Sequence, residues 1–324
     1  MRKSTSLVAL AAVGMLALAG CTGGGETPSA SEPAEGPAET TEITVGVIPI
    51  VDVAPIYLGV SQGFFEDEGL DVTLELAQGG AAIVPAVVSG EYQFGFSNIT
   101  SLLLATSNDV PLKAVAPGNF TTGAEPDFGA VVVPAESEIQ AAADLAGHTV
   151  AVNTLNNIGD STIRNVVEED GGDPGAIEFV EMGFPDMPAA VASAQVDAAW
   201  ILEPHLTRAL EQGARVVSWN YFETDPELMI AAYFTSQQYA SENPEVVEAF
   251  VAALETSLEY AESNPDETRA VLDEYTDIDP AVKEAMVMPR FQTEFSEDSV
   301  QLLADLALEY GLVTDPVDFA ELLP

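Results

Sequence analysis

From Ile43 onward, short apolar runs alternate with longer runs in which apolar residues recur every three or four positions. The short runs are typical of β-strands and the longer ones of amphipathic helices. Strands are predicted at residues 43–48, 70–76, 92–96, 112–116, 128–133, 148–152, 176–180, 197–201 and 229–235. Helices are predicted at residues 55–65, 81–89, 98–107, 159–170 and 186–194. This alternation predicts an α/β fold built on mainly parallel sheets.

The strand and helix repeats fall into two successive sets that meet near Phe128, which predicts two lobes rather than one wide sheet. We expect residues 43–127 and 236–324 to form the first lobe and residues 128–235 the second, with a ligand cleft between them. Residues after 235 are expected to be almost all helical. An apolar stripe along residues 244–264 would suit packing against the first lobe.

The chain start has the pattern of an export signal. Arg2 and Lys3 precede an apolar stretch from Leu7 to Leu18, which is too short to span a bilayer. LAGC, which ends at Cys21, resembles the bacterial lipobox, in which the cysteine is lipidated and becomes the mature N-terminus. We therefore expect a signal peptide over residues 1–20. A lipidated cysteine and a disordered, acidic, proline-containing tether would follow over residues 21–42. The protein would then be extracytoplasmic and lipid-anchored to the cell membrane.

Charge and cysteine content exclude several classes of function. The chain has 53 acidic and 9 basic residues, for a formal net charge of −44, so it cannot neutralise nucleic-acid phosphates. Its one cysteine permits neither an intrachain disulfide nor a multi-cysteine metal site. The histidines, His148 and His205, lack the spacing of a metal pair or a catalytic relay. The chain also lacks the H-E-x-x-H motif of zinc proteases and a P-loop motif. We expect no enzyme activity, no cofactor and no metal, and a monomer.

Polar residues gather at the predicted strand exits, where open α/β sheets bind ligands. The loop NTLNNIG (153–159) leaves one strand and enters a helix, whose first N–H groups are free to hold a polar group. N-capping and turn formation alone would also explain these asparagines. Similar exits carry Gly79 and Gly80 after one strand, and Ser97 and Asn98 after another. Several such loops converging favours a binding site.

Three segments resemble one known family. They are IPIVDVAPIYLGVSQGFFEDEGLDVTLELAQGGAAIVPAVVSGEYQFGFSN, DLAGHTVAVNTLNNIGDSTIRNVVEEDGGDP and MPAAVASAQVDAAWILEPH. They resemble, in the expected order, the solute-binding lipoproteins of ABC importers that bind nitrate, sulfonates, taurine or thiamine precursors. The chain departs from the family pattern at Gln93, where an acid is usual, and at His148, where lysine is common.

The resemblance implies a type II periplasmic-binding-protein-like fold that closes on a small solute and delivers it to an ABC permease in the membrane. It points, motif by motif, to thirteen ligand-binding candidates: Asp52, Ala54, Gly79, Gly80, Ala81, Ser97, Asn98, Asn153, Thr154, Asn156, Ile158, Trp200 and Glu203. Two other functions stay open on this fold. One is a ligand-sensing or adhesive lipoprotein, and the other is an enzyme of pyrimidine synthesis, as in fungal relatives.

The chemistry of these candidates does not select a single solute. Helix starts would suit a sulfonate-like or nitrate-like anion. Trp200 and Glu203, which end an apolar strand, would instead grip a heteroaromatic ring and its donor group, with Asp52 and Phe184 as further contacts. The alternative is that Trp200 belongs to the core and Glu203 caps the helix after Pro204. Phe120, Phe184 and Asp186 are weaker candidates, because GFPDMP would also suit a turn and an N-cap before the next helix. The scarcity of arginines counts against a strongly charged anion.

Overall fold

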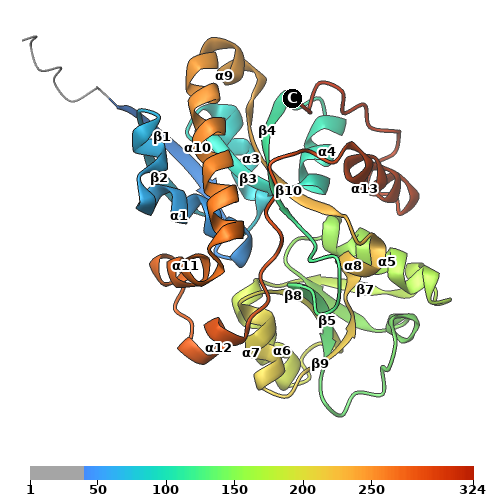
Figure 1. Ribbon diagram of the computed structural model, residues 1–324. Coiled ribbons are helices and arrows are strands. Elements are labelled where there is room, and N and C mark those ends of the chain that lie inside the picture. Colours follow the sequence, from blue (N-terminus) through green and yellow to red (C-terminus); the bar gives the residue numbers. More distant parts are fainter. Residues whose placement is uncertain (1–39) are drawn as a thin grey trace, which may run out of the picture. The chain divides into compact units, whose positions relative to one another are not determined.

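Two five-stranded sheets form the framework of the protein in a computed structural model, which describes residues 40–324. The predicted signal peptide, Cys21 and most of the predicted tether lie outside the described residues. In the first sheet the strands run in the order β2-β1-β3-β10-β4, and in the second β7-β6-β8-β5-β9. We call the two sheets with their covering helices the first and second lobes; they are the upper and lower halves of Figure 1.

The strand bounds agree closely with the sequence pattern. The first sheet contains β1 (Thr41–Val47), β2 (Leu70–Leu76), β3 (Phe94–Asn98), β4 (Leu112–Phe120) and β10 (Met229–Ser236). The second contains β5 (Gly129–Val133), β6 (Thr149–Val152), β7 (Glu178–Glu181), β8 (Ala198–Leu202) and β9 (Arg215–Ser218). β9 was not predicted from the sequence, because its four residues are only half-buried for most of their length and form a short edge strand.

The sheets are mainly parallel, as expected. In the first sheet β1 pairs in parallel with β2 and β3, whereas β10 runs antiparallel between β3 and β4. The second sheet repeats this arrangement, with β5 antiparallel to its neighbours β8 and β9. In each lobe the antiparallel strand is thus the one that the chain enters directly after crossing from the other lobe.

The predicted lobe boundary at residue 235 is wrong, because β10 belongs to the first sheet rather than to the second lobe. Its sequence MIAAYFTS is fully buried and would suit the centre of either sheet. The path of the chain, rather than the residues of β10, therefore decides which of the two sheets the strand joins.

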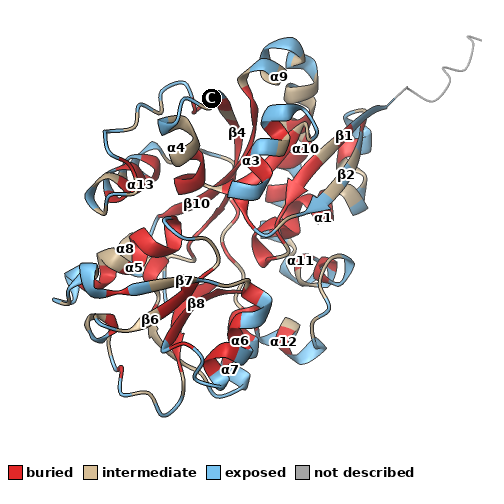
Figure 2. Ribbon diagram, turned by 180° about the vertical axis from the view of Figure 1, so that it is seen from behind, coloured by how far each residue is buried: buried red, intermediate tan, exposed pale blue. Residues whose placement is uncertain are grey.

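Helices cover both sheets. The first lobe carries α1 (Ala54–Gln62), α2 (Phe64–Asp67), α3 (Gly80–Ser89), α4 (Ile99–Ser107), α9 (Gln237–Glu242), α10 (Pro244–Ser263) and α11 (Pro265–Ala270). The second carries α5 (Ile158–Glu169), α6 (Met187–Ala192), α7 (His205–Glu211) and α8 (Asn220–Thr224). Figure 2 shows the strands largely buried and the outer helical turns exposed. Helix α1 begins with Pro55 in its first turn and ends at Gly63, whose φ of 84° lies in the left-handed region that favours glycine.

The stripe on residues 244–264 packs as the sequence predicts. Helix α10 lies against α1 and α2 of the first lobe. Its buried residues include Phe250, whose ring stacks on Phe94 of β3 with centroids 3.9 Å apart. This contact joins the C-terminal part of the chain to the core formed by the first strands.

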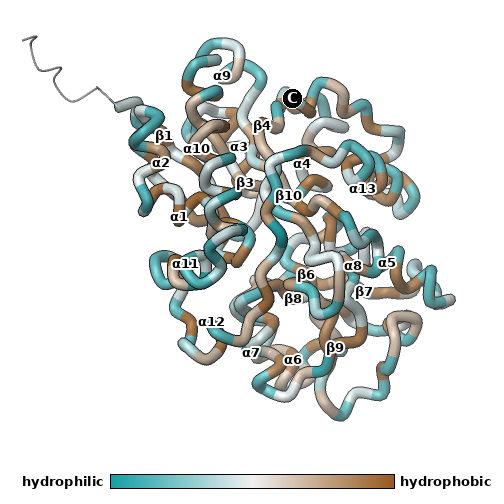
Figure 3. The backbone as a smooth tube through the Cα atoms, viewed as in Figure 1, coloured by the Kyte–Doolittle hydropathy of each residue, from teal (hydrophilic) through white to brown (hydrophobic). Residues whose placement is uncertain are grey.

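The expectation that residues after 235 are almost all helical is only partly correct. After α12 (Pro280–Ala285), the segment 286–295 is extended and forms a bridge between Phe120 and Arg290 before α13 (Glu297–Glu309) begins. Pro289 helps to exclude a helix here because it lacks an N–H group and restricts the residue before it. α12 contacts α7, and α13 contacts both α4 and α5, so this segment touches both lobes. Figure 3 shows α13 as alternating brown and teal, the pattern of an amphipathic helix.

Candidate functional site

A small cavity lies where the two lobes meet, which we call the inner cavity. It is lined by Ile48, Ile50, Asp52, Phe96, Asn98, Asn153, Ile158, Phe184, Trp200, Leu202, Tyr221, Ile230 and Ala231. Its volume is about 20 Å³, roughly the space that one water molecule needs. The lobes are therefore in contact around it, and any larger ligand requires them to move apart.

Asp52 is the one ionisable carboxylate in this lining. It follows β1 in a short 3-10 turn, Val51–Val53, and is 2% exposed. Asn119 Nδ2 donates to Asp52 Oδ2 at 2.9 Å, whereas Asp52 Oδ1 is buried with no hydrogen-bond partner. Burial raises the pKa of Asp52 to about 7, against opposing hydrogen bonds from its own backbone and Asn119. A buried acceptor without a partner costs free energy, so a donor on a ligand would stabilise this group.

Aromatic rings form the opposite wall. Trp200 is 1% exposed and packs edge-on against Phe184 and Tyr221, with centroid distances of 5.6 and 5.5 Å. The Nε1 atom of Trp200 is also buried with no partner. A Cβ at Gly159 would lie 2.7 Å from the Trp200 ring, so glycine at the start of α5 leaves room for the indole. The lining thus includes these three aromatic rings, one of which carries a buried N–H donor without a partner.

The lobes also make direct polar contacts across the cleft. Asn157 Nδ2, at the start of α5, donates to Ser101 Oγ in the first turn of α4 at 2.9 Å. The backbone N–H of Val51 donates to the carbonyl of Glu203 at 3.1 Å. A Cβ built on Gly79 would lie 3.1 Å from Thr154 Oγ1. These contacts mean that the two lobes are closed on each other.

The loop 153–159 divides its residues between two roles. Asn153 is half-buried and lines the inner cavity. Asn156 is exposed, has a left-handed φ of 52°, and donates its backbone N–H to Asp160 Oδ2 at 2.8 Å. Asn157 caps α5, with its side chain accepting from the N–H of Ile158. The structure therefore gives Asn156 the turn-forming role rather than a place in the cavity.

Five of the thirteen predicted ligand-binding residues line the inner cavity: Asp52, Asn98, Asn153, Ile158 and Trp200. Gly79 and Thr154 lie instead in the contact between lobes. Ala54, Ala81 and Ser97 do not line the cavity; Ala54 and Ser97 are buried inside the first lobe, and Ala81 is exposed on α3. Gly80 serves packing, because a Cβ there would lie 1.8 Å from Ser97 Oγ.

Glu203 is likewise placed away from the cavity, contrary to the prediction. Its carboxylate accepts from the N–H and the hydroxyl of Thr207, at 3.0 and 2.7 Å, and from the N–H of Val287 at 3.2 Å. It therefore caps α7, close to the alternative weighed from the sequence, and ties down segment 286–295. Burial raises the pKa of Glu203 to about 6.

Several cavity residues were not predicted from the sequence. Tyr221 lies in α8, where the chain returns to the first lobe. Asn119 of β4 is not part of the lining, but it orients Asp52, which is. Ile230 and Ala231 come from β10. No local motif marks these positions, because only the crossing of the chain between lobes brings them to the cavity. Phe96 had a weak signal, since it directly precedes Ser97 at a strand exit.

Basic side chains are kept away from this site. Of the nine Lys and Arg residues, Arg2 and Lys3 precede the described part, and none of the other seven lines the inner cavity. For example, Lys113 bonds the carbonyl of Leu323, and Arg290 bonds Glu227 and the carbonyl of Thr121. Across residues 40–324, no three His, Cys, Asp or Glu side chains form a metal-binding group.

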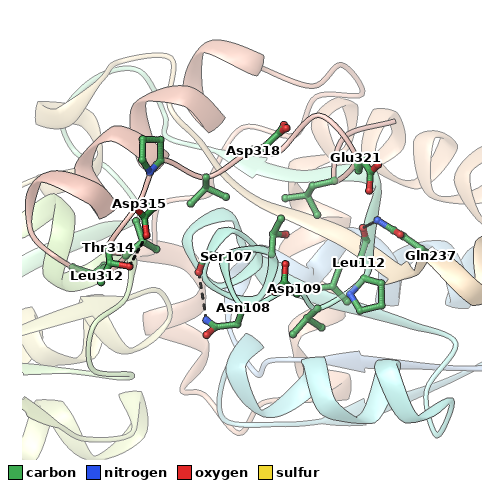
Figure 4. Close-up of a pocket in the computed structure, with 17 residues that line it drawn as sticks. Ser107, Asn108, Asp109, Leu112, Gln237, Leu312, Thr314, Asp315, Asp318 and Glu321 are labelled. Carbon is green, nitrogen blue, oxygen red and sulfur yellow. Dashed lines mark hydrogen bonds between the residues drawn. The ribbon is translucent and has the colours of Figure 1, made fainter.

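A larger cavity, of about 580 Å³, lies at the edge of the first lobe between the end of α4 and the C-terminal segment. Figure 4 shows its lining, which includes the carboxylates of Asp109, Asp315, Asp318 and Glu321. All its residues come from one lobe, so closure of the lobes would not enclose a ligand there. The inner cavity is the better candidate because both lobes build it.

Two α/β lobes of this topology, closed over a cavity with polar and aromatic walls, define the class of bilobal solute-binding proteins. The fold is shared with the alkanesulfonate-binding protein SsuA from Xanthomonas axonopodis pv. citri, solved bound to MOPS. That structure has a TM-score of 0.75 and 20% identity, and the match covers 89% of this chain and 99% of that one.

The family model described as NMT1/THI5 like matches residues 50–268, and the chain belongs to this family. The formylaminopyrimidine-binding protein of Halalkalibacterium halodurans is 26% identical over 251 residues, which are 76% of this chain and 72% of that protein. The taurine-binding periplasmic protein of Escherichia coli is 28% identical over 194 residues, which are 58% and 56% of the two chains. Within residues 40–324, no helix is long and apolar enough to cross a membrane.

Proposed function

We propose that the protein captures a small solute outside the cytoplasm for an ABC importer. We further propose that this solute is a flat, nitrogen-containing heteroaromatic with a hydrogen-bond donor. The class of function follows from the family and the fold. The nature of the solute rests on one observation: Asp52 lines a cavity with aromatic walls, and its buried Oδ1 atom has no hydrogen-bond partner.

The electrostatics of the cavity favour this solute over a sulfonate or nitrate. An anion beside Asp52 would meet a like charge or require the carboxyl to stay protonated, with no Lys or Arg in the lining to compensate. An amino group on a ring would satisfy Asp52 Oδ1, and a ring acceptor could take the Trp200 N–H. The relative that is a formylaminopyrimidine-binding protein is consistent with this chemistry.

The aromatic wall supports the same conclusion. Phe184, Trp200 and Tyr221 present ring faces and edges that a planar heterocycle can pack against. Because the closed lobes leave only about 20 Å³, the ring would enter an opened cleft, and the lobes would close on it less tightly than they close on each other here.

Binding rather than catalysis is proposed because the relatives that match most of this chain are binding proteins, and the cavity lining holds one carboxylate, Asp52, without a cysteine, histidine or lysine to act with it. Attachment to the membrane through a lipid on Cys21, and a monomeric state, remain part of this proposal. A sensing or adhesive role on the same fold would use the same cleft but no permease.

Calorimetry with three probes tests the solute. We expect 4-amino-2-methylpyrimidine to bind and to stabilise the protein by about 2.7 kcal/mol at a hundred times its Kd. Methanesulfonate and nitrate, as anionic probes without a hydrogen-bond donor, should leave the melting temperature unchanged. Tight binding of either anion, with no binding of the aminopyrimidine, would refute the assignment to a heteroaromatic while leaving the class of function intact.

A further inference from the structure

A second cavity of about 240 Å³ adjoins the inner one, and we call it the vestibule. Its lining is Ile48, Pro49, Ile50, Leu76, Ala77, Gln78, Gly183, Phe184, Pro185 and His205. Ile48, Ile50 and Phe184 line both cavities, so a ligand that extends past these three residues would occupy both.

Both lobes build the vestibule. In the first lobe, Ile48 to Ile50 follow β1, Leu76 ends β2, and Ala77 and Gln78 follow it. Gly183 to Pro185 follow β7, and His205 begins α7, in the second. Leu76 is 51% exposed, although it is a large apolar side chain at the mouth of a cleft. Closure of the lobes therefore shapes the vestibule as well as the inner cavity.

The lining of the vestibule is apolar and carries no charge. Eight of its ten residues are aliphatic, aromatic, proline or glycine, and the others are Gln78 and His205. Burial, together with the nearby Arg208, lowers the pKa of His205 to about 4, so this imidazole is neutral at pH 7. An apolar cavity of about 150 Å³ is enough to accept a benzene ring.

The volumes of the two cavities also favour a ligand that occupies both. Ligand sites in proteins usually measure about 300 to 1,000 Å³, far more than the inner cavity alone provides. Together the two cavities come close to the lower end of that range.

Resting on the proposed function, we infer that the vestibule is a second subsite that holds an uncharged apolar substituent of the solute, up to the size of a benzyl group. The solute then has two parts. Its donor-bearing ring lies between Asp52 and Trp200, and its substituent lies against Ile48, Leu76 and Phe184.

The test compares 4-amino-2-methylpyrimidine with its 5-benzyl derivative by calorimetry. In the wild-type protein the benzyl derivative should bind at least about 10-fold more tightly, because it buries several additional apolar carbons. Ala77→Trp, which fills the vestibule, should abolish that gain and leave the Kd of the unsubstituted pyrimidine within about 2-fold. Val88→Trp is the matched control, since Val88 is exposed on α3 and lines neither cavity.

Because Ala77 is packed against the core, a second variant guards against misfolding. Leu76→Gln, at an exposed position, should reduce the gain from the benzyl group and leave the unsubstituted pyrimidine unaffected. If the pyrimidine binds but the benzyl group adds nothing, or if the gain survives both variants, the subsite is refuted and the proposed function stands. If neither compound binds, both inferences fail.

Discussion

Asp52 is held between two opposing effects. Burial disfavours its charged form, whereas the hydrogen bonds from its own backbone and from Asn119 favour it. The free Oδ1 atom is the acceptor that a ligand donor would complete. The residue therefore links the recognition of a solute to the protonation state of the ligand-free protein.

Asp52→Asn should weaken the binding of 4-amino-2-methylpyrimidine by about 1 to 3 kcal/mol, because the ligand donor loses a charged acceptor. Calorimetry at pH 7.5 measures this loss. Asp186→Asn is the control, since Asp186 is exposed two residues after Phe184 and lines neither cavity. Equal affinities of wild type and Asp52→Asn would show that the carboxylate does not contact the solute.

The same substitution should change how stability depends on pH. Between its ordinary pKa of 3.8 and its native pKa of about 7, Asp52 binds a proton in the folded protein that the unfolded chain has released. Folding stability therefore falls as pH rises through this window. A shift of this size has an upper limit of about 4 kcal/mol, so we expect ligand-free Asp52→Asn to be more stable than wild type at pH 8 by at least about 1 kcal/mol.

This ionic contribution should vanish at about pH 3 and below, where Asp52 is protonated in most molecules of both states of the wild type. Urea unfolding of both proteins at pH 3 and pH 8 measures it. Asp160 and Glu203, whose pKa values burial raises to about 6, are present in both proteins and cancel in the difference. A stability difference that is the same at both pH values would contradict the assignment.

At the scale of single elements, the loop 153–159 offers a matched pair of asparagines. Asn153→Ala should weaken solute binding by about 1 to 3 kcal/mol if its side chain bonds the ligand in the cavity. Asn156→Ala should leave affinity unchanged and lower stability by about 1 kcal/mol, because its φ of 52° is unfavourable for alanine. Asn156→Gly should restore that stability, since glycine adopts this conformation readily.

Affinity and melting temperature of the three variants separate the two roles. The sequence-based prediction that both asparagines hold the ligand now applies to Asn153 alone. If Asn153→Ala changes only the melting temperature, the whole loop forms a turn and recognises nothing.

Elements were predicted well where the pattern is local. Nine of the ten strands in the described chain were placed within about two residues at their starts, because buried strands such as β5 and β8 are uninterrupted apolar runs. What could not be predicted is which sheet a buried strand joins. The run MIAAYFTS carries no mark of its partners, and only the chain path sends β10 between β3 and β4.

The candidate site shows the same difference between features that the local sequence predicts and features that depend on the folded chain. Asp52, Asn98 and Asn153 lie at strand exits and could be found by that rule. Glu203 lies at such an exit as well, yet its carboxylate already accepts hydrogen bonds from the N–H groups of Thr207 and Val287. The sequence places a polar residue at the right end of a sheet, but competition from nearby backbone donors decides whether it is free for a ligand.

At the scale of the whole molecule, the first prediction concerns attachment to the membrane. Cys21 lies outside the described residues, and its lipidation rests on the likeness of LAGC to a lipobox. Cys21→Ser should abolish the lipid and leave a soluble or signal-retaining protein. Mass spectrometry of the wild-type protein should find a mature chain that begins at a diacylated cysteine. An unmodified Cys21 inside a mature chain would refute the anchor.

The second prediction concerns motion between the lobes. The chain crosses between them at residues 121–128, at residues 219–228 and along segment 286–295, so the lobes can rotate about these crossings. The bond from Asn157 to Ser101 spans the cleft and, as a buried hydrogen bond, favours the closed state. We call this bond the latch, because breaking it would shift the equilibrium between closed and open lobes toward the open form.

Ser101→Ala removes the latch acceptor with little change in volume. The ligand-free variant should spend more time open, which raises its radius of gyration in solution scattering, and a saturating solute should return it to the wild-type value. Affinity should fall by about 0.5 to 1.5 kcal/mol, the net contribution of one such bond. Ser107→Ala, at the exposed end of the same helix, should change neither quantity. If scattering of Ser101→Ala matches the wild type with and without solute, the bond does not control closure.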